Sequence, residues 1–310
     1  GLAHIGVLRA LDEAGIGVHA IAGTSIGALI GAIAAAGNLG DVAERFLKFD
    51  WRAVAGLLDP VFPRSGLIDG RRIGEFVRAH VPAARIEDLP IPFRAVATDL
   101  RTGQEVVIAS GDLIEAVRAS IAVPGIFTPV RSGTRVLVDG GVVNPVPVSV
   151  VRAMGADRVI AVDLNADIAT RRTGRARAGA PAPATPQGLS ASAKEASTPP
   201  DAGLAGRFAA LANSAVVERL RTLGNPAWAQ FNAWLRGAGQ PGIFDVLLGS
   251  IDIMQARITQ ANLRACPPEL LIQPPLAHVR FMAYDRAGEI IEAGYQCART
   301  AVQDWQRTQG

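Results

Sequence analysis

The chain has 310 residues, of which 49% are hydrophobic and 5% are aromatic, and its formal net charge is only +3. This length and apolar content suffice for one large or two small globular domains, and the near-neutral charge argues against a dedicated nucleic-acid binder. Two cysteines, Cys266 and Cys297, form no metal-binding or redox motif, so we expect free thiols in a reducing, cytoplasmic compartment.

The first fifteen residues predict a helix. Ile5, Leu8 and Leu11 share one helical face, and Gly15 supplies a stop signal at the end. The chain opens at Gly1 without an initiator Met and goes directly into this helix. We therefore expect that a strand and a loop precede it in the natural protein.

Residues 18–36 organise the rest of the chain. A short apolar run ends at Gly23-Thr24-Ser25-Ile26-Gly27, and a run of small apolar residues follows at once. This order predicts a strand, a turn so sharp that Gly23 and Gly27 must nearly lack side chains, and a helix. The serine lies at the helix N-terminus, where the Ile26 N–H and the helix dipole favour an oxyanion. We predict that Ser25 is a catalytic nucleophile.

Two other interpretations of this stretch remain open. A G-x-S-x-G pattern arises easily by chance in a chain with 33 glycines. Residues 16–39 also carry no charged side chain, and Gly23, Gly27 and Gly31 repeat at the spacing of packed membrane helices. Polar residues interrupt this stretch, which is rich in Gly and Ala rather than Leu and Phe. We therefore favour the turn and expect no transmembrane span.

Strands and helices alternate through residues 41–164. Helices are expected over 41–58, from Asp69 to His80, from Asp112 to a stop at Pro124, and over 148–154. Strands are expected at these ranges: 93–98, 105–109, 135–139 and 158–164. Such alternation is the signature of a mostly parallel central sheet covered on both faces, which predicts a three-layer α/β/α fold.

The C-terminal half divides into a linker and a helical extension. Residues 168–206 are rich in Ala, Pro, Gly and Ser and begin with four arginines, at positions 171, 172, 175 and 177. We interpret this segment as a solvated flexible linker; the alternative is that the arginines contact an anionic membrane surface. Residues 207–310 then predict helices at 209–223 and 243–263, a last strand at 278–283 and a helix at 289–306. The predicted catalytic core is thus 1–167.

A serine needs a partner that accepts its proton. The four histidines are His4, His19, His80 and His278, and none lies in a glycine-rich loop after a strand. Asp139 follows a predicted strand directly and precedes Gly140 and Gly141, which leave room for a substrate. In a dry site a carboxylate is basic enough to serve.

The alternative for Asp139 is an ordinary hairpin turn, for which Asp-Gly-Gly is a common sequence. Asp99 and Asp163 also end strands but lack the glycine pair. We predict that Asp139 is the proton acceptor.

The motifs together resemble a known family. GLAHIGVLRALDEAGI, GTSIG, ASIAVPGIFTPV and DGGVVNPVPV occur in the order and spacing of the patatin-like phospholipases. The later segments IDIMQARI and YDRAGEIIEAGYQCA resemble the bacterial branch related to neuropathy target esterase. The resemblance implies a patatin-like fold and a Ser25–Asp139 dyad without histidine, metal or organic cofactor. It also implies hydrolysis of acyl esters of phospholipids, lysophospholipids or neutral lipids.

The oxyanion hole departs from the family pattern. The family uses a glycine-rich loop, G-x-G-x-x-G, ahead of the first helix, and only its last glycine, Gly1, is present here. The Ile26 N–H supplies one donor, and the resemblance places the others upstream. Since loss of one such donor typically costs about 3 kcal/mol of transition-state stabilisation, the alternative function is a non-catalytic lipid-binding or scaffold protein.

Overall fold

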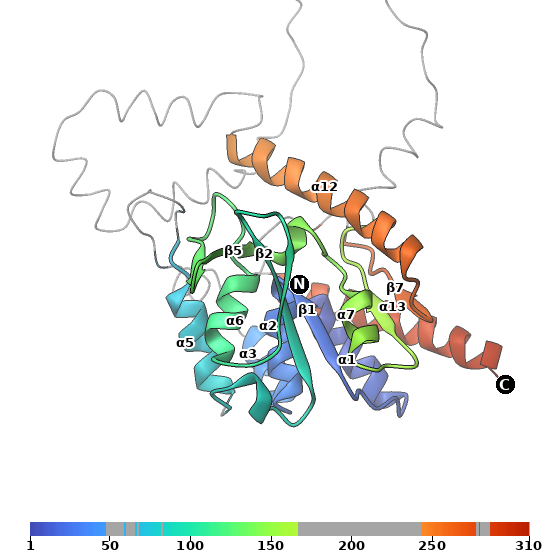
Figure 1. The fold of residues 1–310 in the computed structure, drawn as a ribbon. Helices are drawn as coiled ribbons and strands as arrows, with labels where there is room; N and C mark the ends of the chain where they lie inside the picture. The colour runs from blue at the N-terminus through green and yellow to red at the C-terminus, as the bar shows by residue number, and fades with distance from the viewer. Residues whose placement is uncertain are drawn as a thin grey trace, which may run out of the picture. The chain divides into compact units, whose positions relative to one another are not determined.

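A computed structural model of the chain describes residues 1–47, 59, 66, 68–81, 83–166, 243–276, 279 and 286–309. The described residues of 1–166 and 254–309 belong to one compact unit (Figure 1). The predicted linker at 168–206, the helix at 209–223 and nearly all of the strand at 278–283 lie outside the described residues. The domain boundaries therefore stay predictions.

The main sheet has the order β1-β2-β5-β4, with β3 also pairing with β2. Its strands are β1 (Ile21–Thr24), β2 (Phe93–Asp99), β3 (Glu105–Ile108), β4 (Val130–Ser132) and β5 (Arg135–Asp139). Only β1 and β2 are parallel, while β2–β3, β2–β5 and β4–β5 are antiparallel. The sheet is mixed, so the expectation of a mostly parallel sheet is wrong. The physical reason is loop length: β2–β3 and β4–β5 are joined by short turns, which connect only antiparallel neighbours.

A second sheet pairs β6 (Ile160–Val162) in parallel with β7 (Leu270–Ile272), a strand that the sequence analysis did not predict. Ile160, Val162 and Ile272 face α1 (Ala3–Glu13) and α13 (Ala287–Gln309). Ala161 and Leu271 face the opposite way, toward α7 (Val148–Ala153) and Leu263 of α12 (Ile243–Ala265). Helices thus cover both faces, which confirms the expected three-layer α/β/α fold.

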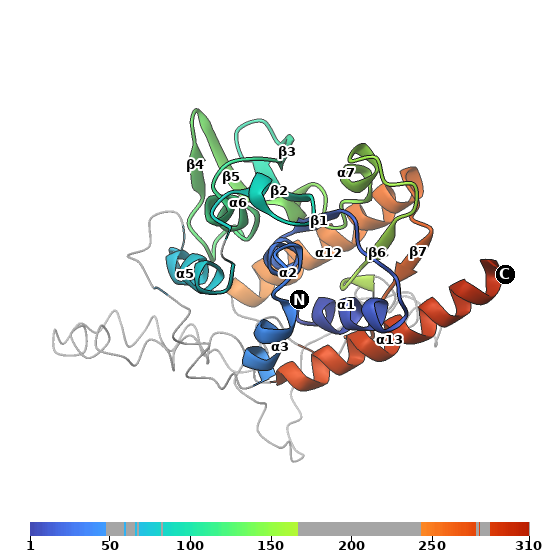
Figure 2. The same cartoon turned by 90° about the horizontal axis from the view of Figure 1, so that it is seen from below.

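Among the described residues, the largest apolar cluster joins Phe93 and Ala95 of β2 to α1 and α2 near the N-terminus and to α13 near the C-terminus. Figures 1 and 2 show α2 and α6 side by side next to β2. The remaining helices of the described residues are α2 (Ile26–Ala35), α3 (Leu39–Leu47), α5 (Arg71–His80), η1 (Ile86–Asp88), α6 (Leu113–Ser120) and η2 (Gly140–Val142). The sequence predicts that Asp112 begins a helix. In the structure Asp112 caps α6, because its carboxylate accepts hydrogen bonds from the N–H groups of Ile114 and Glu115 at 2.8 and 3.0 Å.

The membrane-helix interpretation of residues 16–39 is wrong. This stretch contains β1, a turn and α2, and α2 has only 10 residues. A helix of that length spans about 15 Å, half of a bilayer core. Across the described ranges, no helix combines the length and apolar composition that crossing a membrane requires.

Helix α13 lies side by side with α1, as Figure 2 shows. Two glycines allow the backbones to touch. A Cβ atom on Gly6 would lie 1.9 Å from the carbonyl oxygen of Ile291, and one on Gly294 would lie 2.2 Å from that of Ala3. The C-terminal helix is thereby fixed against the helix that precedes the Ser25 strand.

We predict that Gly294→Ala destabilises the protein by about 1–3 kcal/mol, because the added methyl group forces the two backbones apart. Gly288→Ala is the matched control in the same helix, since its Cβ would meet only Leu47 Cδ2 at 3.6 Å. The control should be neutral or stabilising by up to about 1 kcal/mol. Chemical denaturation measures both, and equal midpoints for Gly294→Ala and the wild type would contradict the close crossing.

Candidate active site

Ser25 stands at the turn between β1 and α2 in a strained conformation. Its φ is 55° and its ψ is −128°, and within the described residues it is the one non-glycine with positive φ. Such strain persists only where the surroundings impose it, and it marks functional sites. Here the close approach of the two arms of the turn imposes it, because a Cβ on Gly23 would lie 2.4 Å from the Gly27 carbonyl oxygen. A Cβ on Gly27 would meet nothing nearer than His4 Nε2 at 3.7 Å, so the expectation that this position must also lack a side chain is wrong.

The Ser25 backbone is held by a serine that the sequence analysis did not assign. Ser25 N–H donates to Ser120 Oγ at 2.9 Å, and Ser120 Oγ donates to the carbonyl oxygen of Val96 at 2.6 Å. Ser120 is fully buried at the end of α6. A hydroxyl in the otherwise apolar run ASIAVPG is the signal that marks it, because a buried hydroxyl needs partners.

Asp139 meets Ser25 at the end of β5. Ser25 Oγ donates to Asp139 Oδ2 at 2.5 Å, and Gly141 N–H donates to Asp139 Oδ1 at 2.6 Å. The residues after Asp139 form the 3₁₀ helix η2, not the hairpin turn of the alternative interpretation. Gly140 is required there, since its Cβ would lie 2.3 Å from the Val96 carbonyl oxygen. The structure thus brings the two predicted residues into direct contact.

Burial changes the chemistry of this carboxylate. Asp139 is only 1% exposed. Burial raises the pKa of Asp139 from 3.8 to about 6, although the hydrogen bonds from Ser25 and Gly141 act in the opposite direction. A carboxylate with this pKa is a far better proton acceptor near neutral pH than an exposed one.

The described histidines form no hydrogen bond with the pair. His4 Nδ1 lies 2.7 Å from the Gly1 carbonyl oxygen, and His80 Nδ1 lies 2.6 Å from that of Phe76. Burial lowers the pKa of His4 to about 4, so this imidazole is neutral near pH 7. Among the hydrogen bonds of the described residues, none joins a histidine to Ser25 or Asp139, and His278 lies outside them. The other strand-end acids, Asp99 and Asp163, also bond elsewhere.

Gly1 and Ile26 lie together beside the serine. A Cβ on Gly1 would be 2.1 Å from Ile26 Cγ1. In the part of the chain that the structure describes, no acceptor bonds the Ile26 N–H, which begins α2. This free donor is where an oxyanion would be stabilised, and its role stays a prediction. Over the same described ranges, no group of three or more His, Cys, Asp and Glu side chains could hold a metal ion.

Comparisons with known proteins identify the family. A family model described as patatin-like phospholipase matches residues 1–152. An uncharacterised NTE family protein of Mycobacterium bovis is 35% identical over 322 residues, covering 98% of this chain and 88% of that protein. The chain belongs to the NTE family of patatin-like phospholipases.

Longer relatives share the same region. An uncharacterised NTE family protein of Mycobacterium tuberculosis is 32% identical over 311 residues, covering 98% of this chain and 44% of that protein. The patatin-like phospholipase domain-containing protein 6 of Mus musculus is 35% identical over 171 residues, covering 53% of this chain and 12% of that protein. The patatin-like match to this NTE family chain contains both Ser25 and Asp139.

We predict that Asp139→Asn stabilises the fold in a pH-dependent way. The pKa of Asp139 is higher when folded, so the wild type loses stability as pH rises from about 4 to about 6. Asparagine keeps the shape and carries no charge, so the variant should gain up to about 3 kcal/mol over the wild type at pH 8. Denaturation at pH 4 is the internal control, because the carboxyl is then neutral in the folded wild type. If the free energies of unfolding of the two proteins differ by the same amount at pH 4 and pH 8, the result would contradict a destabilising buried charge on Asp139.

Proposed function

We propose that this protein is a serine acyl hydrolase that cleaves carboxylic esters of lipids through Ser25 and Asp139. Its membership of the patatin-like phospholipases supports lipid hydrolysis in general terms. The observation that carries the specific proposal is the 2.5 Å hydrogen bond from Ser25 Oγ to the buried Asp139 carboxylate. A nucleophile and base at this distance meet the geometric requirement for acyl transfer.

In the acylation step, Ser25 Oγ attacks the acyl carbonyl carbon while Asp139 Oδ2 accepts the hydroxyl proton. The carbonyl oxygen becomes an oxyanion at the N-terminus of α2, where the Ile26 N–H and the helix dipole stabilise it. When the tetrahedral intermediate collapses, the ester C–O bond breaks and the leaving alcohol takes the proton from Asp139. The products are a free alcohol and an acyl group on Ser25.

In the deacylation step, Asp139 accepts a proton from water as the water oxygen attacks the acyl carbon. The Ser25–acyl bond then breaks, Ser25 Oγ recovers the proton from Asp139, and a carboxylic acid leaves. One carboxylate thus acts as base and then as acid in each half of the cycle. Its raised pKa suits both roles, because neither protonation state is strongly favoured near pH 6.

Exposed apolar side chains near the dyad support a lipid substrate. Val142 is 39% exposed and follows Gly141, while Met254 is 55% exposed and precedes Gln255. Gly141 and Gln255 are in contact, since a Cβ on Gly141 would lie 2.4 Å from Gln255 Nε2. An acyl chain that approaches Ser25 would bury part of this apolar surface. Contact of the arginines at 171–177 with anionic lipid remains a separate proposal on residues outside the described ranges.

We predict that Ser25→Ala and Asp139→Asn each lower ester hydrolysis by at least about a thousandfold, with no further loss when they are combined, because the two act as a unit. Hydrolysis of a short-chain p-nitrophenyl ester and of a lysophospholipid measures this. Ser132→Ala, which alters an exposed serine on β4, is the control and should keep full activity.

A fluorophosphonate probe should label Ser25, as shown by mass spectrometry of the modified peptide. Labelling of a different serine, or full activity in either dyad variant, would contradict the assignment. Lipid binding without hydrolysis by the wild type would favour the non-catalytic lipid-binding alternative.

We predict that kcat/KM rises with pH through a midpoint near 6. Below that pH Asp139 in the free enzyme is protonated and cannot accept the serine proton, whereas above it the carboxylate is available. A pH–rate profile between pH 4.5 and 8.5 with an uncharged ester tests this. A rate independent of pH across this range would show that Asp139 is not the base.

A further inference from the structure

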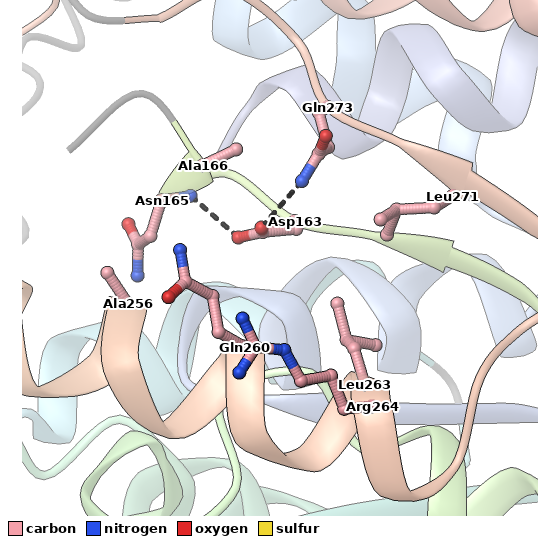
Figure 3. A pocket seen from close by; sticks show the side chains of 9 residues that line it. All are labelled: Asp163, Asn165, Ala166, Ala256, Gln260, Leu263, Arg264, Leu271 and Gln273. Carbon is pink, nitrogen blue, oxygen red and sulfur yellow. Dashed lines mark hydrogen bonds between the residues drawn. The ribbon is translucent and has the colours of Figure 1, made fainter. Parts of the chain in front are cut away.

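Polar side chains gather where the second sheet ends. Asp163 directly follows β6 and Gln273 directly follows β7. Because these strands are parallel, both residues lie at the same edge of the sheet, where α/β proteins commonly bind ligands. They line an open cavity of about 310 Å³, which Figure 3 shows from close by.

The opposite wall of this cavity comes from α12. Gln260 and Arg264 reach into it from successive turns of the helix, as Figure 3 shows, and Ala256 and Leu263 supply apolar surface. Asn165 completes the rim beside Asp163. The lining therefore offers one guanidinium, one carboxylate and several amide groups around a small apolar floor.

Asp163 and Arg264, the two charged residues that line the cavity, form no ion pair with each other. Asp163 is 5% exposed, and its carboxylate accepts the Asn165 N–H at 2.9 Å and Gln273 Nε2 at 3.1 Å. Each of its oxygens can still accept a second hydrogen bond. Among the ion pairs of the described residues, none includes Asp163 or Arg264. The cavity is thus set up for a ligand that carries an anionic group at one end and a hydrogen-bond donor at the other.

A short chain of contacts links this cavity to the dyad. Asn165 Nδ2 donates to Gln255 Oε1 at 3.1 Å, and Gln255 Nε2 lies against Gly141. Gly141 N–H in turn binds Asp139. Only one glutamine side chain therefore separates the rim of the cavity from the loop that holds the proposed base.

We propose that this cavity binds the phosphate ester of a small polyol or amino alcohol, as the headgroup of the lipid that Ser25 cleaves. This rests on the proposed function. Arg264 and Gln260 donate to the phosphate oxygens, and Asp163 accepts from the distal hydroxyl or ammonium group. A neutral glyceride has no group for Arg264. The same chemistry occurs in a free phosphate compound, so the tests below separate the two sources.

The first test measures binding without catalysis. Ser25→Ala protein is titrated by calorimetry with glycerophosphoethanolamine, the soluble deacylated headgroup, and separately with inorganic phosphate. Adding Arg264→Gln should weaken glycerophosphoethanolamine binding about tenfold, as expected for one lost charge-assisted contact. The matched control is Arg257→Gln, an exposed arginine on α12 that does not line the cavity. Equal affinity with and without the Arg264→Gln substitution would overturn the site.

The second test uses the active protein and compares two substrates. The ratio of kcat/KM for lysophosphatidylethanolamine to that for p-nitrophenyl butyrate should fall about tenfold in Arg264→Gln and stay constant in Arg257→Gln. Binding of inorganic phosphate through Arg264 with an unchanged ratio would assign the cavity to free phosphate and overturn the headgroup role. No hydrolysis of either ester by the wild type would instead refute the proposed function, and calorimetry alone would then decide whether the cavity binds phosphate esters.

Discussion

The hydrogen bond between Ser25 Oγ and Asp139 Oδ2 depends on the central strand of the main sheet. Thr24, directly before Ser25, pairs with Val96 of β2, and Asp139 pairs with the next residue, Ala97. Adjacent positions of one strand therefore bring together residues 114 positions apart in the chain. The antiparallel β5 ends opposite the middle of β2, so the strand register brings Asp139 to the serine.

This arrangement holds Ser25 and Asp139 in a reactive geometry and lowers the stability of the folded protein. The chain holds Ser25 at positive φ and buries a carboxylate, and both raise the free energy of the folded state. Ser120 and Gly141 compensate in part, because each supplies a hydrogen bond to one member of the pair. Removing the strain or the charge would give a more stable protein with a weaker nucleophile or base, a trade-off common at active sites.

Local signals in the sequence were enough to find the two proposed catalytic residues. Ser25 lies within a strand–turn–helix pattern whose tight turn requires a glycine at position 23, and Asp139 follows a short apolar strand. Strand β7 and the Asn165–Gln255 contact could not be predicted, since each acquires its role from a partner at least 90 residues away. The hydroxyl of Ser120 in an apolar run signals that it needs partners, but not that Ser25 is one of them. The sheet was misjudged for a similar reason: the alternation of strands and helices does not reveal which strands pair through short turns.

The central claim is that a buried carboxylate, not a histidine, takes the proton of Ser25. The most direct measurement is an NMR titration of the Asp139 side-chain carbon in protein labelled with ¹³C at aspartate, with Asp139→Asn to assign the signal. The account predicts a single titration with a midpoint near pH 6. A midpoint near 4, typical of an exposed aspartate, would contradict it.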